Sequence, residues 1–462
     1  MQYHQAPNFS DNHSSNTQYR SINHSFTVHF FSGSFFMIQN EDLLHYIWKY
    51  RLYRIPDLKS SSGERLEVIS PGQHNHHAGP DFSNAKIRIG DTLWAGNVEI
   101  HIRSSDWHRH QHQVDKAYDN VILHVVAYHD QSIFRTDGTE ITVLEIDKQI
   151  PQAISKNYED LMAGLNWIPC EKKIMLVDQN YINTCLTRVL MERLEEKSKL
   201  IEKLLVEVKG SWDDAFYITL ARNFGFKINA LPFEMLARSI PQSLLARYKD
   251  RPLQIEALIF GQAGFLDQKV KDTYPQLLKK EYCFLQKKHD LIPLDKYIWK
   301  YMRLRPHNFP SIRLAQFAAL IIRSNHLFSE IIHERDIKFI GGMFNKLKIN
   351  EYWNTHYRFD QDSAFSELTL GKEAINNILI NTVAVFLFTF GLKTGSENHQ
   401  ERALILLESL KPERNAIIQR FQEIGVTSIN ASISQALIQL KKSYCDQKKC
   451  LSCNIGVKFM NK

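Results

Sequence analysis

Cysteine is scarce in this sequence, and the scarcity excludes one class of protein. The chain has 462 residues and six cysteines, which is too few and too unevenly spread for the disulfide framework of a small secreted protein. Cys445, Cys450 and Cys453 nevertheless lie close together near the C-terminus. This clustering predicts thiols that are either kept reduced or bound to a metal.

Long apolar runs are also missing. No window approaches the roughly 18 consecutive apolar residues of a membrane-spanning helix, and polar residues interrupt the aromatic stretch 26–37. The first residues carry no basic start followed by an apolar block and a cleavage site. We therefore expect a cytoplasmic protein with no membrane partner. The net charge of +7 permits DNA or RNA as a partner without requiring either.

Composition divides the chain into four parts. Residues 1–36 are rich in Ser, Asn, His and Gln, which predicts a disordered or non-native extension. Residues 37–150 contain a helix at 40–53 followed by strand and turn signals, which predicts an α/β domain. Residues 151–440 have helical periodicity, so we expect an α-helical domain. Residues 441–462 form a basic tail that contains the three clustered cysteines.

Five runs in the α/β part have the apolar pattern of strands. Gly90-Asp91 separates the second run from the third and predicts a hairpin. The five runs are 66–69, 82–89, 93–102, 121–128 and 141–146.

The densest polar chemistry lies on this predicted hairpin. Two carboxylates from neighbouring strands, with one backbone carbonyl, can hold magnesium or manganese and leave positions for water. Asp81, Glu99 and the carbonyl of Ile100 meet that description. His101 lies on the strand face of Glu99 and is placed to orient or deprotonate the attacking water. Lys86 is the alternative residue for that role.

Strand register decides whether the two carboxylates meet. With a two-residue turn, Asp81 would pair opposite Ile100 and point away from Glu99. A bulge at Gly96, or a longer turn, would bring Asp81 opposite His101 and onto the face of Glu99. The carboxylate site therefore requires an irregularity in the hairpin.

Two other interpretations of this segment remain open. In the first, Asp81 caps a turn, Glu99 lies on a solvated sheet face, and the histidines are surface residues. In the second, the histidines themselves bind zinc, iron or nickel, for which neutral imidazole is a common ligand. The histidines concerned are His101, His108, His110 and His112.

The C-terminal cysteines follow a C-x4-C-x2-C pattern that supplies three ligands and lacks a fourth. Cys170 is the candidate for the fourth, with Cys185 and Cys283 as lesser candidates. Zinc and an iron-sulfur cluster both suit such a site. The alternative is a set of reduced thiols on a solvated tail.

The order of these motifs resembles the PD-(D/E)XK nuclease superfamily. Pro80-Asp81 opens the second strand and Glu99-Ile100-His101 forms the acidic-x-basic triplet of the third, with His101 where the family has lysine. The resemblance implies a mixed sheet flanked by helices in a metal-dependent nuclease, or in a nucleic-acid-binding protein derived from one. A remote cysteine with a C-terminal trio is similar to the iron-sulfur clasp of some of these nucleases. The rival functions are a non-catalytic scaffold or interaction protein and a histidine-ligated transition-metal enzyme.

The chain from about residue 37 to its end also resembles an uncharacterised bacterial family, domain of unknown function 2851, found mainly in Bacteroidetes. That resemblance implies no activity. The motifs that carry it are AGPDF at 78–82, GNVEIH at 96–101, SDW at 105–107, YDNVILHVV at 118–126, EALIFGQAG at 256–264 and CLSC at 450–453.

Two features of the helical part complete the expectations. Residues 256–265 read as a tightly packed helix that ends at a glycine. The basic, proline-punctuated segment 303–313 either contacts phosphates or pairs with nearby carboxylates. If the protein binds nucleic acid, this segment and the lysine tail are where removing charge weakens binding.

Overall fold

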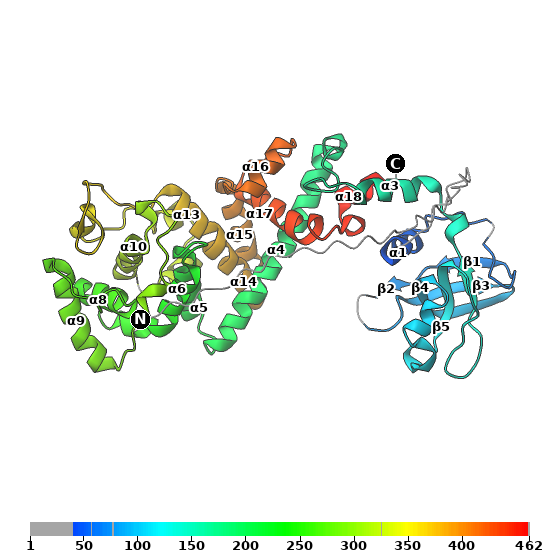
Figure 1. The fold of residues 1–462 in the computed structure, drawn as a ribbon, viewed down its shortest axis with the longest axis horizontal. Helices are drawn as coiled ribbons and strands as arrows, with labels where there is room; N and C mark the ends of the chain where they lie inside the picture. The colour runs from blue at the N-terminus through cyan, green and yellow to red at the C-terminus, as the bar shows by residue number, and fades with distance from the viewer. Residues whose placement is uncertain (1–39, 57, 76–77, 325, 461–462) are drawn as a thin grey trace, which may run out of the picture. The chain divides into compact units, whose positions relative to one another are not determined.

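The computed structural model describes residues 40–56, 58–75, 78–324 and 326–460. The predicted extension 1–36 lies outside the described residues. The chain forms two compact units that divide between Ser155 and Lys156, close to the predicted boundary and inside helix α3 (Gln152–Met162). Figure 1 shows the elements of each unit.

The first unit is built on a mixed sheet with the strand order β1-β3-β4-β5-β6, and β2 also pairs with β3. β1, β2 and β4 are antiparallel to β3, whereas β5 and β6 continue the sheet in parallel. The predicted α/β plan is confirmed at this level. The strands are β1 (Leu66–Ser70), β2 (Gln73–His74), β3 (Phe82–Ile89), β4 (Thr92–Arg103), β5 (Val121–Tyr128) and β6 (Val143–Glu145).

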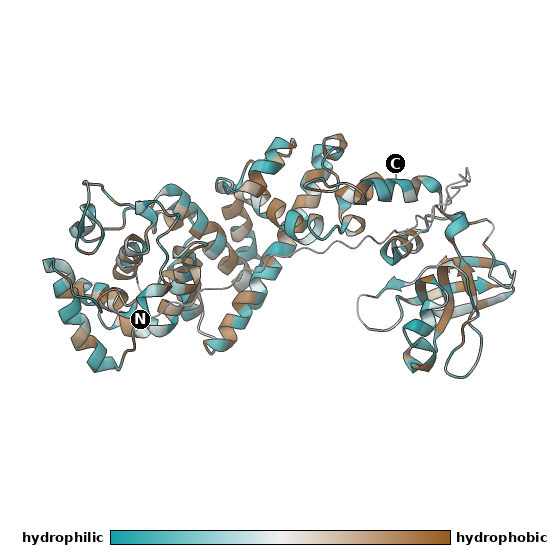
Figure 2. Ribbon diagram, in the orientation of Figure 1, coloured by the Kyte–Doolittle hydropathy of each residue, from teal (hydrophilic) through white to brown (hydrophobic). Residues whose placement is uncertain are grey.

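Burial explains the places of these strands. β5 is a continuous apolar run whose first seven residues are all buried, as expected for an interior strand covered on both faces. β3 alternates buried and exposed residues from Ala85 to Ile89, which is the pattern of a strand with one solvated face. Helix α1 (Glu41–Tyr50) buries Leu44, Ile47 and Trp48. Figure 2 shows the apolar residues concentrated along the interior strands.

The hairpin contains the irregularity that the carboxylate site requires, but at a different residue. Ile89 pairs with Thr92 across a two-residue turn, and the register shifts between Phe82 and Ala85. The extra residue is therefore in β3 and not at Gly96. Asn84 has a φ of 58°, a left-handed conformation that asparagine adopts more readily than most residues.

This bulge changes the partner of Asp81. Phe82 pairs with Val98. Asp81, the residue before Phe82, therefore comes opposite Glu99 and not opposite His101. Residues directly opposite one another share a face of the sheet. The prediction that the carboxylates share a face is thus met through a different pairing.

Gly96 is required for another reason. A Cβ added there would lie 2.4 Å from Cγ2 of Ile122 and 2.7 Å from the carbonyl oxygen of Asn120. The missing side chain allows β4 and the start of β5 to approach closely.

The second unit is mostly helical, as predicted. Its helices are α4 (Gln179–Glu207), α5 (Trp212–Phe224), α6 (Ala230–Ser239), α7 (Gln242–Ala246), α8 (Pro252–Gln262), α9 (Thr273–His289), α10 (Pro310–Arg323), α11 (Leu327–His333), α12 (Ile337–Gly342), α13 (Lys372–Ile378), α14 (Ala384–Thr394), α15 (Glu397–Ser409), α16 (Ala416–Glu423), α17 (Ala431–Gln439) and α18 (Asn454–Met460), with a small hairpin of β7 (His356–Arg358) and β8 (Gln361–Asp362).

One continuous helix, Lys372–Thr394, is long and apolar enough to cross a membrane by length and composition alone. In this structure 72% of its apolar window is buried, and the aromatic rings of Trp212, Phe328 and Phe386 pack against one another at its surface. That burial is typical of the core helix of a soluble protein. The cytoplasmic location stays a prediction.

The predicted basic tail is a packed part of the second unit. Lys441 is buried and its ammonium group lies 5.0 Å from the ring centroid of Trp167. Helix α18 buries Ile455, Phe459 and Met460. Residues 441–460 therefore continue the helical fold.

Candidate metal centre

Four side chains on three adjacent segments converge beside β4. Glu99 and His101 are two residues apart on β4 and therefore share a face. His110 follows α2 (Asp106–Arg109), and His112 begins the short helix η1 (His112–Val114). Gln111 between them has a φ of 62°, and this tight reversal lets both histidines face the strand.

The nitrogen and oxygen atoms of this group are spaced as metal ligands are. The candidate ligand atoms of His101, His110 and His112 all lie within 4.8 Å of one another. Nε2 of His101 is 3.1 Å from Nδ1 of His110, and Oε1 of Glu99 is 3.3 Å from Nε2 of His112 and 3.5 Å from Nε2 of His101. Ligands about 2.1 Å from a tetrahedral ion lie roughly 3.4 Å apart. We call these four residues the histidine centre.

One buried nitrogen in the histidine centre makes no well-aligned hydrogen bond among the described residues, although Oε1 of Glu99 lies 3.3 Å from it. It is Nε2 of His112, whose ring stacks on Tyr118 with the centroids 3.7 Å apart. A buried nitrogen without a well-aligned hydrogen bond is costly in an empty site. An ion coordinated at this position would remove that cost.

His124 of β5 orients His101 from behind. Its Nε2 is 2.9 Å from Nδ1 of His101, and its own Nδ1 is buried and has no hydrogen-bond partner in the described part of the chain. If His101 donates this hydrogen bond, its Nε2 carries a lone pair directed at the other ligands. Such an outer hydrogen bond is the usual support of a metal-binding histidine.

Burial keeps the imidazoles of His101 and His124 neutral. Burial, together with the neighbouring His110 and His112, lowers the pKa of His101 to about 3. Burial also lowers the pKa of His124 well below its ordinary value. Neutral imidazole is the form that binds a metal, so the lone pair of His101 is available at neutral pH without deprotonation.

The two carboxylates meet, as the hairpin argument required, but each binds the backbone of the other strand. The Asp81 N–H donates to Oε2 of Glu99 at 3.1 Å, and the Ile100 N–H donates to Oδ2 of Asp81 at 3.0 Å. Oε1 of Glu99 is not used in these bonds, and it faces imidazoles. The donor set suits zinc, iron, nickel or manganese, whereas magnesium prefers oxygen ligands.

Asp81 has a second partner that comes from α1. Nε2 of His45 lies 3.2 Å from Oδ2 of Asp81. Burial lowers the pKa of His45, but the hydrogen bond and charge of Asp81 outweigh it and hold that pKa above its ordinary value. Burial likewise raises the pKa of Glu41, with the nearby His110 and His45 opposing the shift. An acid-base pair therefore lies beside the histidine centre.

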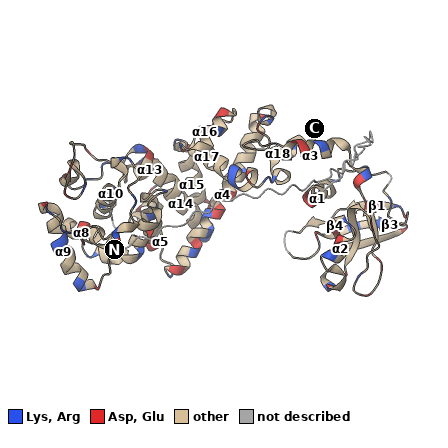
Figure 3. Ribbon diagram, in the orientation of Figure 1, with Lys and Arg blue, Asp and Glu red and all other residues tan. Residues whose placement is uncertain are grey.

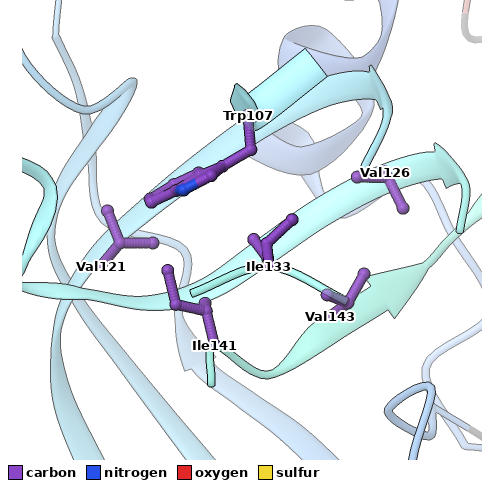
Figure 4. Packing of buried hydrophobic residues seen from close by; sticks show 6 residues of the cluster. All are labelled: Trp107, Val121, Val126, Ile133, Ile141 and Val143. Atoms are coloured by element: carbon purple, nitrogen blue, oxygen red, sulfur yellow. The ribbon is translucent and has the colours of Figure 1, made fainter. Parts of the chain in front are cut away.

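A hydrophobic cluster supports the histidine centre from the sheet side. Trp107 is fully buried and packs with apolar residues of β5, β6 and the intervening loop, as Figure 4 shows. The same indole ring lies 5.2 Å from the His112 ring and 5.5 Å from the His124 ring. The apolar members of the cluster are Val121, Val126, Ile133, Ile141 and Val143.

The structure does not bring every predicted residue to this place. Lys86 pairs with Ala95 on the far side of the bulge and its side chain is exposed. His108 is only half-buried and does not belong to the converging group. His45, Tyr118 and His124 were not predicted as site residues; His124 and Tyr118 stood in a recognised motif, but no local signal marked His45.

In the basic segment 303–313, expected either to contact phosphates or to pair with carboxylates, Arg313 binds uncharged side chains. Arg313 is buried, its guanidinium stacks 4.6 Å from the ring centroid of Phe226, and it donates to Asn308 and Gln316. It lines a cavity of about 770 Å³ in the second unit. Figure 3 shows Lys and Arg spread over many elements rather than gathered on one.

The comparisons with known proteins identify the family and nothing finer. A family model described as "Protein of unknown function (DUF2851)" matches residues 41–416, which is more than half of the chain. The chain belongs to this family. The match covers the histidine centre but ends before the CLSC motif. No curated protein and no solved structure matches the sequence, so the PD-(D/E)XK relationship stays a prediction.

Proposed function

We propose that this DUF2851 protein is a metal-dependent phosphodiesterase whose ion is held by the histidine centre. The observation that carries the proposal is the spacing of the candidate ligand atoms. The pairs His101–His110, His101–Glu99 and His112–Glu99 lie 3.1 to 3.5 Å apart. An ion held there would activate a water and offset negative charge on a phosphodiester. Nucleic acid is the proposed substrate because of the PD-(D/E)XK resemblance and the basic net charge.

Residues around the histidine centre are placed to take part in such a reaction. Glu99 and His101 are nearly completely buried, whereas His110 is exposed, so the centre opens on the side of His110. His45 and Asp81 are partly accessible, and the pair can take a proton from water. The Arg109 side chain is largely exposed next to His110 and can contact a phosphate.

The test is cleavage of labelled single- and double-stranded DNA and RNA by the purified, chelator-treated chain, with zinc, manganese, nickel or magnesium added back. We expect cleavage with the transition metals, lost in Glu99→Gln and His112→Gln. His108→Gln is the matched control, because it lies in the same segment outside the centre, and Lys86→Gln should also keep activity.

Three results would count against the proposal. Cleavage that requires magnesium and survives His112→Gln would favour the two-carboxylate site instead. Loss of cleavage in Lys86→Gln would show that Lys86 takes part in the reaction. Unaltered metal binding without cleavage of any substrate would leave a structural ion and a non-catalytic scaffold.

A further inference from the structure

The second unit contains a cavity that the proposed reaction does not use. Its volume is about 770 Å³, which is within the range of pockets that hold small organic ligands. Every residue of its wall belongs to the second unit, whereas the histidine centre belongs to the first. Phe226, Phe233 and five asparagines contribute to the wall. The cavity therefore offers both apolar surface and hydrogen-bonding groups to an organic molecule.

Arg313 is a buried cation on this wall without an anionic partner. The residue is only 6% exposed, and its terminal nitrogens donate to the uncharged side chains of Gln316 at 2.9 Å and Asn308 at 2.6 Å. Its Nε is buried and has no hydrogen-bond acceptor among the described residues. Burial lowers the pKa of Arg313 to about 10, so the guanidinium is still charged at neutral pH. A buried, unpaired charge is unfavourable, and a bound anion would compensate it.

Four helices begin at this cavity. Asn229 and Asn415, which line it, are the N-cap residues of α6 and α16. Pro310 is the first residue of α10, and Lys372 begins the continuous helix Lys372–Thr394; both also line the cavity. The N-terminus of a helix is the positive end of its dipole and favours an anion. These four termini therefore add to the positive potential of the buried guanidinium.

Cationic side chains outnumber carboxylates on the wall, five to two. The carboxylate of Glu373 pairs with Arg414 at 3.2 Å, and that of Glu413 accepts a hydrogen bond from Gln435. Three of the cations are exposed lysines, which lie where the cavity meets solvent. This excess of positive charge matches a doubly charged phosphate better than a single carboxylate. The three lysines are Lys227, Lys372 and Lys411.

Phe226 links the buried cation to the apolar part of the wall. Its ring centroid lies 4.6 Å from the Arg313 guanidinium, and its backbone has a φ of 50°. That left-handed conformation is unusual for a bulky residue. Backbone strain of this kind is found preferentially at binding sites, where the surrounding structure maintains it.

We propose that this cavity binds a nucleoside monophosphate. The phosphate oxygens accept hydrogen bonds from Nε of Arg313 and from the exposed lysines. The base and sugar lie against the phenylalanines and asparagines of the wall, because side-chain amides can pair with the polar edge of a base. This proposal does not rest on the nuclease activity proposed above.

The test is isothermal titration calorimetry of the full chain with AMP, GMP, CMP and UMP. EDTA in the buffer keeps metal out of the histidine centre. We expect saturable binding of at least one monophosphate and binding of its nucleoside that is weaker by roughly tenfold or more. Inorganic phosphate should bind more weakly than the nucleotide, because it makes no contact with the phenylalanines. Equal affinity for nucleotide and nucleoside, or no saturable binding of any monophosphate, would overturn the proposal.

Variants locate the binding site. Arg313→Gln should weaken nucleotide binding by roughly ten- to a hundredfold. Lys372→Gln should weaken it by about threefold and make it less dependent on salt. Lys280→Gln, which changes an exposed lysine of α9 outside the cavity, is the matched control and should bind as the wild type does. Binding that is lost in His112→Gln and retained in Arg313→Gln would assign the ligand to the histidine centre and overturn the proposal.

A buried arginine can also be structural, so thermal unfolding accompanies the titrations. The nucleotide should raise the unfolding midpoint of the wild type but not that of Arg313→Gln. If Arg313→Gln does not fold, the double variant Lys227→Gln/Lys372→Gln decides, because both side chains are exposed. Its nucleotide affinity should fall by roughly tenfold, and an unchanged affinity would overturn the proposal.

Discussion

Glu256 shows at the scale of one residue how a recognised motif can be structural. Its carboxyl is buried in α8, and burial raises its pKa to about 7, which the neighbouring Tyr274 hydroxyl opposes only in part. The packing role predicted for this helix is consistent with its complete burial from Ile255 to Gln262. The buried acid should make stability depend on pH.

The sign of that dependence follows from the two pKa values. Between pH 4.5 and 7 the folded chain keeps a proton on Glu256 that the unfolded chain releases, so the free energy of unfolding falls as pH rises through this window. Glu256→Gln removes this pH-dependent contribution of the buried carboxyl. It should raise the free energy of unfolding at pH 8 by up to about 3 kcal/mol. The effect should be small at pH 4.5.

Chemical denaturation of both proteins at the two pH values measures this difference. Glu401→Gln, on an exposed surface of α15, is the control and should behave as the wild type at both. An equal effect of Glu256→Gln at pH 4.5 and pH 8 would mean that its charge is not the cause.

At the scale of one element, the bulge in β3 is the feature that brings the two carboxylates together. It turns Asp81 to the face of Glu99, and Asn84 adopts the left-handed conformation that it needs. Asn84→Val should lower the free energy of unfolding by about 2 kcal/mol and weaken metal binding. Asn84→Gly should preserve both, because glycine adopts this conformation freely.

Denaturant titration and metal titration of the two variants test this paired expectation. A valine variant as stable as the glycine variant, with unchanged metal affinity, would show that the bulge does not position the centre.

The hairpin also shows how much of the structure of one element can be predicted from the sequence. Alternation and the Gly90-Asp91 turn predicted β3 and β4, and the apolar run predicted β5, because these signals are local. The need for an irregularity was predictable from register, but its place was not, because a positive φ at Asn84 leaves little trace in sequence. His45 was missed because only folding brings α1 beside Asp81.

Candidate cysteines and histidines could be recognised in the sequence, but their contacts could not be predicted. The C-x4-C-x2-C pattern and Cys170 were recognisable as candidates, yet the packing of Cys185 against Cys453 depends on where α4 lies. Among the histidines, spacing alone could not separate His108 from His110, because the reversal at Gln111 decides which rings face β4.

At the scale of the whole molecule, the helix Lys372–Thr394 organises the second unit from within. Phe386 is fully buried there, whereas Phe365 is 74% exposed. Phe386→Ala should lower the free energy of unfolding by roughly 3 to 5 kcal/mol, and the control Phe365→Ala should change it by less than about 0.5 kcal/mol.

Thermal and denaturant unfolding in the absence of detergent would provide both values. A small effect of Phe386→Ala, together with partition of the wild type into lipid, would show that this helix belongs in a membrane and not in a core.

The central claim is that His101, His110, His112 and Glu99 hold one divalent transition-metal ion, and zinc bound per full-length chain after equilibrium dialysis tests it most directly. Because thiols also bind zinc, the informative quantity is the difference between variants. His112→Gln should bind about one ion fewer per chain than both the wild type and His108→Gln. Equal zinc in all three proteins would contradict the claim.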